Sequence, residues 1–247
     1  MRNSTTILAA AIGGAVLAVA VVLILAQGGW LLINDRQMQT YLMGHSDLAS
    51  AMLSRAQQLD EVRQREAQAA AIQKLGQAAL FDPAVAFVTG PADAKTSLVE
   101  FYDYDCPYCR ASLPAVKKFY QAHKNDTRFS FIEFPIKQLH GESAVLAARA
   151  SLAARRQPAH YMDFHFALLG QEDAITEDMI YAEAGKAGMD VAKLKADMAE
   201  PGIEKSLQSS IALAHKIGVD GTPTFVMNGK MHPGAVDDET LAKEMES

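Results

Sequence analysis

The feature that most constrains this chain is a pair of cysteines, Cys106 and Cys109, separated by Pro107 and Tyr108. They are the only two cysteines among 247 residues. Two thiols at this spacing can close a small disulfide and reopen it, so the pair can carry two electrons. The preceding segment, residues 97–104 (SLVEFYDY), alternates and is rich in β-forming residues, which predicts a strand. Apolar residues at helical spacing follow the pair, so we expect the cysteines where a strand meets a helix N-terminus.

Strands and helices alternate through the rest of the chain. Phe81-Asp82-Pro83 ends a long helical segment and marks a domain boundary. Beyond it, the pattern predicts strands, then a block of helices over about residues 142–215, and then strands again. The predicted strands cover residues 85–88, 97–104, 128–134, 224–227 and 230–232, and a last helix begins at about residue 237. This order indicates an α/β fold with a helical insertion.

The N-terminus is strongly apolar. Between Ile7 and Ile33 the only strongly polar residue is Gln27. Crossing a bilayer core takes roughly 20 apolar residues, so the length favours an uncleaved transmembrane anchor. Arg2 precedes the run, and the positive-inside bias then places the N-terminus in the cytoplasm and the chain after residue 34 outside. A cleaved signal peptide is the alternative, with residues 18–20 (AVA) as the cleavage pattern. Both interpretations export the cysteines to an oxidising compartment.

Residues 47–80 have a composition typical of a helix, being rich in Ala, Gln, Glu and Arg and free of proline. Apolar residues recur at intervals of three, four and seven, but Arg55 and Glu66 interrupt the stripe where a coiled coil needs apolar residues. Two interpretations therefore stay open. The segment is either a solvated spacer or an oligomerisation stalk, which would make the protein a homo-oligomer through residues 47–80.

Charge and composition exclude several classes of function. The net charge of −6 argues against a nucleic-acid partner, and the sequence contains no Gly-rich phosphate loop. A zinc site needs four ligands, which one cysteine pair and scattered histidines do not supply. We therefore expect no metal site and no cofactor. A purely structural disulfide in so small a ring would stabilise little, because the constraint grows with loop length. Cu(I) binding by the two thiolates is chemically feasible but has no other support.

Four segments together resemble the DsbA-like thiol:disulfide oxidoreductases of the thioredoxin superfamily. They are EFYDYDCPYC at 100–109, EFPI at 133–136, SAVLAARASLAA at 143–154 and GTPTFVMNG at 221–229. A CPYC at a strand–helix junction followed by Gly-Thr-Pro-Thr is a specific combination, and the match covers about residues 82–247.

The sequence pattern and the resemblance together predict a three-part organisation. From the pattern alone, residues 1–34 would be a cytoplasmic tip and transmembrane anchor or an uncleaved signal, and residues 35–81 a helical spacer or oligomerisation stalk. Residues 82–247 would form a thioredoxin fold with an inserted helical domain at about residues 142–204.

The resemblance also implies roles for residues outside the cysteine motif. Pro223 would be cis and would face the cysteines, so that its loop presents backbone groups to a substrate chain. Thr222 would tune the sulfur chemistry through its hydroxyl. Glu100 would be a buried carboxylate that helps to move the proton of Cys109. From the sequence alone, Pro223 fits a trans turn equally well, and Glu100 could equally be a solvated carboxylate on the strand.

The position of each cysteine predicts its chemical role. At a helix N-cap, Cys106 faces unpaired backbone N–H groups that favour a thiolate, so we expect it to be the attacking residue. Pro107 suits the first helical position, and Cys109 would be the resolving thiol. Tyr108 lacks the cationic ring of a histidine, and Asp105 adds a negative charge that should oppose ionisation. Both features argue against a very strong oxidant.

These observations predict a periplasmic protein disulfide oxidoreductase held on the inner membrane by its N-terminal helix. In the first interpretation it is an oxidase that donates its disulfide to exported proteins and is reoxidised by a quinone-linked membrane partner. The alternative is an isomerase or reductase kept reduced by a membrane electron donor, which an oligomeric stalk would suit. A copper-handling chaperone is a third interpretation, from another class.

Overall fold

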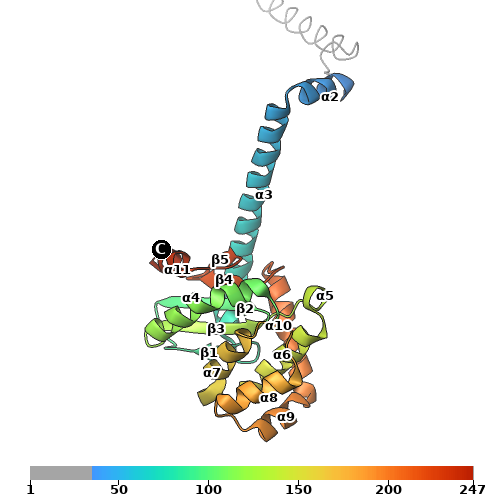
Figure 1. Ribbon diagram of the computed structural model, residues 1–247. Helices are drawn as coiled ribbons and strands as arrows, with labels where there is room; N and C mark the ends of the chain where they lie inside the picture. The colour runs from blue at the N-terminus through green and yellow to red at the C-terminus, as the bar shows by residue number, and fades with distance from the viewer. Residues whose placement is uncertain (1–34, 247) are drawn as a thin grey trace, which may run out of the picture. The chain divides into compact units, whose positions relative to one another are not determined.

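The computed structural model of the protein describes residues 35–246 (Figure 1). The chain divides into two compact units at the junction of Arg63 and Gln64. The first unit contains α2 (Asp35–Gly44) and the first part of α3 (Ser46–Leu75). Within residues 35–246, no helix is long and apolar enough to cross a membrane. The predicted anchor, Ile7 to Ile33, lies outside the described residues.

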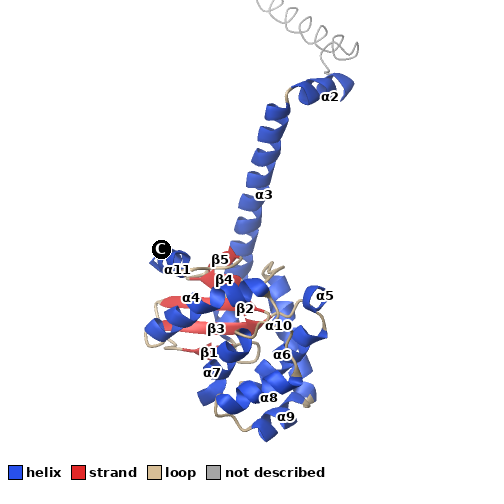
Figure 2. Cartoon of the chain, in the orientation of Figure 1, coloured by secondary structure: helices blue, strands red, loops and turns tan. Residues whose placement is uncertain are grey.

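The second unit is built on a five-stranded sheet with the order β1-β3-β2-β4-β5 (Figure 2). β2 and β3 are parallel and are connected by α4, whereas all other neighbouring strands are antiparallel. The sheet therefore has the expected α/β character. The strands are β1 (Phe87–Thr89), β2 (Thr96–Tyr102), β3 (Thr127–Glu133), β4 (Thr224–Met227) and β5 (Lys230–Pro233).

Alternation along the strands creates two hydrophobic cores. On β2, Leu98 and Tyr102 belong to one core, and Val99 and Phe101 belong to the other. Successive side chains of a strand point to opposite faces, so a strand buried on both faces feeds both cores. The first core is completed by residues of α4, α6 and α7, and the second by the end of α3, the 3₁₀ helix η1 (Gln77–Phe81) and α10.

A block of helices is inserted between β3 and β4, as the sequence predicts, and Figure 1 shows it gathered to one side of the sheet. Prolines occupy the first position of α4, α7 and α10, where the missing N–H costs nothing. The four-residue α5 is not predicted by the sequence. The helices are α4 (Pro107–His123), α5 (Lys137–His140), α6 (Glu142–Ala154), α7 (Pro158–Leu169), α8 (Glu177–Lys186), α9 (Val191–Met198), α10 (Pro201–Lys216) and α11 (Asp238–Glu246).

The second compact unit begins at Gln64, inside α3, whereas the sequence predicts that the thioredoxin-like domain begins at residue 82. The last turns of α3 pack within this unit. Ile72 is buried in the second core, and the side chain of Gln68 donates a hydrogen bond to the carbonyl of Gly218 at 3.0 Å. The local sequence before the proline break at Pro83 carries no sign of this packing.

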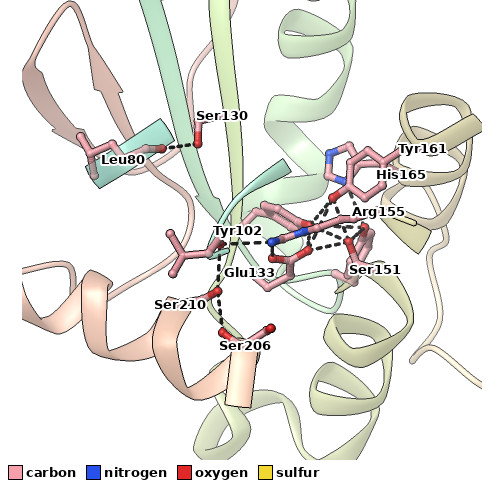
Figure 3. A network of polar contacts seen from close by, with 12 residues as sticks. Leu80, Tyr102, Ser130, Glu133, Ser151, Arg155, Tyr161, His165, Ser206 and Ser210 are labelled. Atoms are coloured by element: carbon pink, nitrogen blue, oxygen red, sulfur yellow. Dashed lines mark hydrogen bonds and ion pairs between the residues drawn. The ribbon is translucent and has the colours of Figure 1, made fainter. Parts of the chain in front are cut away.

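A buried polar network ties the sheet to the inserted helices (Figure 3). Glu133, at the end of β3, forms an ion pair with Arg155, the residue that follows α6. The same carboxylate accepts hydrogen bonds from Ser151 at 2.7 Å and from Tyr102 at 3.0 Å. The carboxylate of Glu133 and the hydroxyls of Ser151, Tyr102 and Tyr104 all find partners, which is the condition under which buried polar groups are tolerated. Tyr104 extends the network toward the cysteines by donating to Ser151 at 3.0 Å.

Candidate active site

The site forms where β2 ends and α4 begins. Cys106 is the N-cap of α4, with an extended backbone (φ −76°, ψ 119°), and Pro107 is the first residue of the helix. The backbone N–H groups of the first helical turn have no partner within the helix and point toward the cap. The strand–helix junction predicted from the sequence is therefore present, with Cys106 at its tip and Cys109 one turn further along.

The two sulfurs differ in their tendency to ionise. The pKa of Cys106 is lowered from 9.0 to about 5, chiefly by a hydrogen bond from the Cys109 thiol. Burial opposes this shift, while the Thr222 side chain and the backbone N–H groups of Cys109 and Tyr108 add to it. The pKa of Cys109 is raised, first by burial and then by Cys106 and by Glu100. One sulfur is thus prepared to be a thiolate and the other to keep its proton.

Glu100 lies on β2, six residues before Cys106, and is 1% exposed. Neither of its carboxylate oxygens has a hydrogen-bond partner among the described residues. Burial, followed by the charge of Cys106, raises its pKa from 4.5 to about 8. A carboxyl group with this pKa holds a proton at neutral pH and can release it near the operating pH, which is what a general acid or base requires.

The loop before β4 covers the sulfur of Cys106. The Thr222–Pro223 peptide bond is cis, as the resemblance implied. The thiol of Cys106 donates to the carbonyl of Thr222 at 3.1 Å, so residues 116 positions apart meet at the sulfur. The hydroxyl of Thr222 is buried and has no hydrogen-bond partner among the described residues. It is therefore available to the thiolate, whose pKa it lowers.

The structure modifies the expected effect of Asp105. The sequence predicts that its charge opposes ionisation of the neighbouring Cys106. Instead, the Asp105 carboxylate pairs with the guanidinium of Arg110 at 3.2 Å and accepts the backbone N–H of Ile175 at 3.1 Å. A nearby cation thus offsets the charge, and Asp105 is not among the main influences on the pKa of Cys106. Tyr108 lies between the two cysteines in the sequence, and its side chain is 65% exposed.

Two residues that sequence reasoning did not select lie in the same region. Asp103 is buried in the turn before Cys106, and its carboxylate is 2.7 Å from the Nδ1 atom of His140. The sequence assigns His140 only to the core or the surface, because nothing in the local pattern links positions so far apart. Among residues 35–246, no cluster of three His, Cys, Asp or Glu side chains could hold a metal ion.

Comparison with known proteins identifies the family. Residues 97–246 match the family model described as a DSBA-like thioredoxin domain. The chain belongs to this family of thiol:disulfide oxidoreductases. A solved thioredoxin-like oxidoreductase from Silicibacter pomeroyi DSS-3 is 36% identical, with a TM-score of 0.60 over 68% of this chain and 93% of that one. BcfH of Salmonella enterica Typhimurium is 26% identical, with a TM-score of 0.76 over 92% of this chain and 98% of that one.

Curated relatives of two kinds also match this chain. "Disulfide bond formation protein D" of Bacillus subtilis is 29% identical, covering 64% of this chain and 76% of that protein. The "Na(+)/H(+) antiporter NhaA" of Herminiimonas arsenicoxydans is also 29% identical, over 67% of this chain. The chain spans only about a quarter of the length of such antiporters (26% in this case).

Proposed function

We propose that this protein is a disulfide oxidase of exported proteins, in which Cys106 exchanges with substrate and Cys109 closes the internal disulfide. The observation that carries the proposal is the difference between the pKa values of the two sulfurs. The pKa is about 5 for Cys106 and lies well above the usual range for Cys109. A thiol of low pKa is a good leaving group, and a stabilised thiolate favours the reduced enzyme. Both effects drive the transfer of the disulfide to substrate.

The proposed reaction balances over two exchanges. A substrate thiolate attacks Cys106 of the oxidised enzyme, and the bond to Cys109 breaks. Cys109 leaves with the electron pair and takes a proton, for which the protonated Glu100 is the nearby source. A second substrate thiolate then attacks the mixed disulfide on the substrate side, and Cys106 leaves as a thiolate. The substrate loses two electrons, and the enzyme ends as a dithiol.

Other residues of the site are assigned to binding and tuning. The cis loop at Thr222 and Pro223 offers its backbone to the substrate chain beside Cys106, and the Thr222 hydroxyl supports the thiolate. Pro107 starts the helix that stabilises that thiolate. The exposed ring of Tyr108 offers an apolar contact to the substrate next to the cysteines.

We further propose that residues 1–34 anchor the enzyme in the inner membrane, with residues 35–247 in the periplasm and a quinone-linked membrane protein as the oxidant. The support is the apolar run from Ile7 to Ile33 in the sequence. The dithiol needs an electron acceptor after each cycle, and such a membrane partner would supply it.

A disulfide isomerase or reductase is the second candidate. The observation that favours it is a set of exposed apolar side chains on α3, which would suit an oligomer: Leu48, Met52, Leu53, Leu59 and Val62. An isomerase must be kept reduced, because only a free Cys106 thiolate can attack a wrong disulfide.

The redox state in cells separates these functions. Rapid acid trapping followed by alkylation and gel shift should find Cys106 and Cys109 joined in an oxidase and free in an isomerase. Cys109→Ala should accumulate mixed disulfides with exported proteins, and Cys106→Ala should accumulate none. Trapping by Cys106→Ala rather than Cys109→Ala would reverse the assigned roles, and a dithiol at steady state would rule out the oxidase.

A further inference from the structure

A buried carboxylate lies between the cysteine motif and α5. Asp103 follows the last residue of β2, and its side chain is shielded from solvent. Oδ1 accepts the backbone N–H of Asp105 at 2.9 Å. Oδ2 accepts one hydrogen bond from the backbone N–H of Ile136 and one from Nδ1–H of His140, each at 2.7 Å. The carboxylate therefore fixes the turn before the cysteines to the segment that follows β3.

The backbone of Asp103 faces both cysteines. Its carbonyl accepts the N–H of Cys106 at 3.1 Å, which sets the N-cap residue in place. Burial raises the pKa of Cys109, and a hydrogen bond from the Asp103 backbone partly opposes that rise. Movement of Asp103 would therefore change the surroundings of both sulfurs, although its own side chain points toward α5.

The position of His140 beside this carboxylate is fixed by its own backbone contacts. Among the residues that the structure describes, it supplies the side-chain donor to Asp103, and the other two donors are main-chain groups. Its backbone N–H donates to the carbonyl of Ile136 at 2.9 Å, and its carbonyl accepts the hydroxyl of Ser143 at 3.1 Å. The ring is thus anchored through the backbone on both sides and is largely buried against Asp103.

We propose that His140 is a positioning residue for disulfide exchange, which acts through Asp103 to set the geometry around Cys106 and Cys109. The inference rests on the proposed function of the two cysteines. An Nδ1–H donor 2.7 Å from Oδ2 holds the carboxylate against α5. Without it, Oδ2 keeps a single donor, and the turn that carries the Cys106 N-cap loses one of its fixed points.

The test compares three variants in the full chain. His140→Ala removes the donor, and His140→Asn retains it, since an asparagine amide nitrogen occupies nearly the place of Nδ1. His123→Ala is the matched control, because it removes a second His–Asp contact, with Asp126 at 3.3 Å, that is exposed and lies at the far end of α4. The measurements are the ultraviolet titration of the Cys106 thiolate, the equilibrium with glutathione and the rate of exchange with a reduced model peptide.

We expect His140→Ala to slow exchange about tenfold, to shift the Cys106 titration and to change the glutathione equilibrium constant. His140→Asn and His123→Ala should match wild type in all three. If His140→Ala has wild-type values, the proposal is overturned. If His140→Ala does not fold, His140→Gln decides, because its amide nitrogen is displaced from the Nδ1 position. Equal behaviour of His140→Gln and His140→Asn then overturns the proposal.

Failure of the proposed function would look different. Wild-type protein would then show no exchange with the peptide and an ordinary Cys106 titration. A normal wild type with an unchanged His140→Ala would instead reject only the role of His140.

Discussion

Two sulfurs in neighbouring turns of one helix acquire opposite acid–base behaviour from their surroundings. Cys109, the Thr222 side chain and the backbone N–H groups of the first helical turn lower the pKa of Cys106, whereas Cys109 is fully buried and its pKa is raised by burial, Cys106 and Glu100. Hydrogen bonds to a charged form favour that form, and burial disfavours it. Which of the two sulfurs becomes the thiolate thus depends on which one is near the hydrogen-bond donors.

The first prediction concerns the Cys106 thiolate. Alkylation of the reduced protein by iodoacetamide should rise through a midpoint near pH 5, the pKa of Cys106. Thr222→Val should move the midpoint upward by roughly half a unit to one unit, because the hydroxyl no longer stabilises the thiolate. Thr240→Val, at a partly buried threonine of α11, is a control that should leave the midpoint in place. A wild-type midpoint near that of free cysteine would contradict the assigned site electrostatics.

The second prediction concerns Glu100. Its pKa of about 8 in the fold lies above its ordinary value of 4.5, so the native state binds the proton more tightly than the unfolded chain. The associated stability is full below pH 4.5 and is lost as the pH rises through about 8. Glu100→Gln should therefore be more stable than wild type at pH 9 by roughly 2–4 kcal/mol and should lose that advantage toward pH 4.

Urea unfolding of the reduced proteins across this pH range checks the second prediction. The same variant should slow the opening of the enzyme disulfide by a substrate thiolate roughly tenfold or more, because the leaving Cys109 loses its proton source. A pH-independent difference in stability would show that Glu100 does not titrate in this range.

At the scale of elements, local sequence signals were sufficient for most of the fold. Alternating β-forming residues predicted β2, and Pro107 fitted the first position of α4. The four-residue α5 is too short to show periodicity. The contacts of Asp103 with His140 and of Asp105 with Ile175 span 37 and 70 positions, and no local pattern encodes them. No local pattern encodes the burial of the end of α3 either, because it depends on the contact of Gln68 with Gly218, far along the chain.

The third prediction addresses the network that joins the sheet to the helical insertion. Glu133→Gln leaves the guanidinium of Arg155 buried without its counterion, which typically costs about 3–5 kcal/mol. Glu142→Gln is a matched control, since it breaks an exposed pair with Lys137 and should change the free energy of unfolding by about 0.5 kcal/mol or less. Urea denaturation measures both. Equal effects would mean that the network does not hold the insertion to the sheet.

At the scale of the whole molecule, α3 exposes a series of apolar side chains to solvent. Met52, Leu53, Leu59 and Val62 are 58%, 66%, 42% and 49% exposed. Single exposed apolar residues are ordinary, but a series of them along one helix indicates an interaction surface. Arg55 and Glu66 interrupt a regular heptad, so association through this helix would be weaker than in an ideal coiled coil.

The fourth prediction is that residues 35–247 associate through α3 in solution. Light scattering at increasing concentration should give a mass above that of one chain. Met52→Glu combined with Leu59→Glu should reduce it to one chain, because two carboxylates cannot be buried in an apolar seam at acceptable cost. Gln57→Glu combined with Gln64→Glu adds the same charge outside the apolar series and should leave the mass unchanged. If all three proteins are monomers at every concentration, α3 is a solvated spacer, and the isomerase alternative loses the feature that favours it.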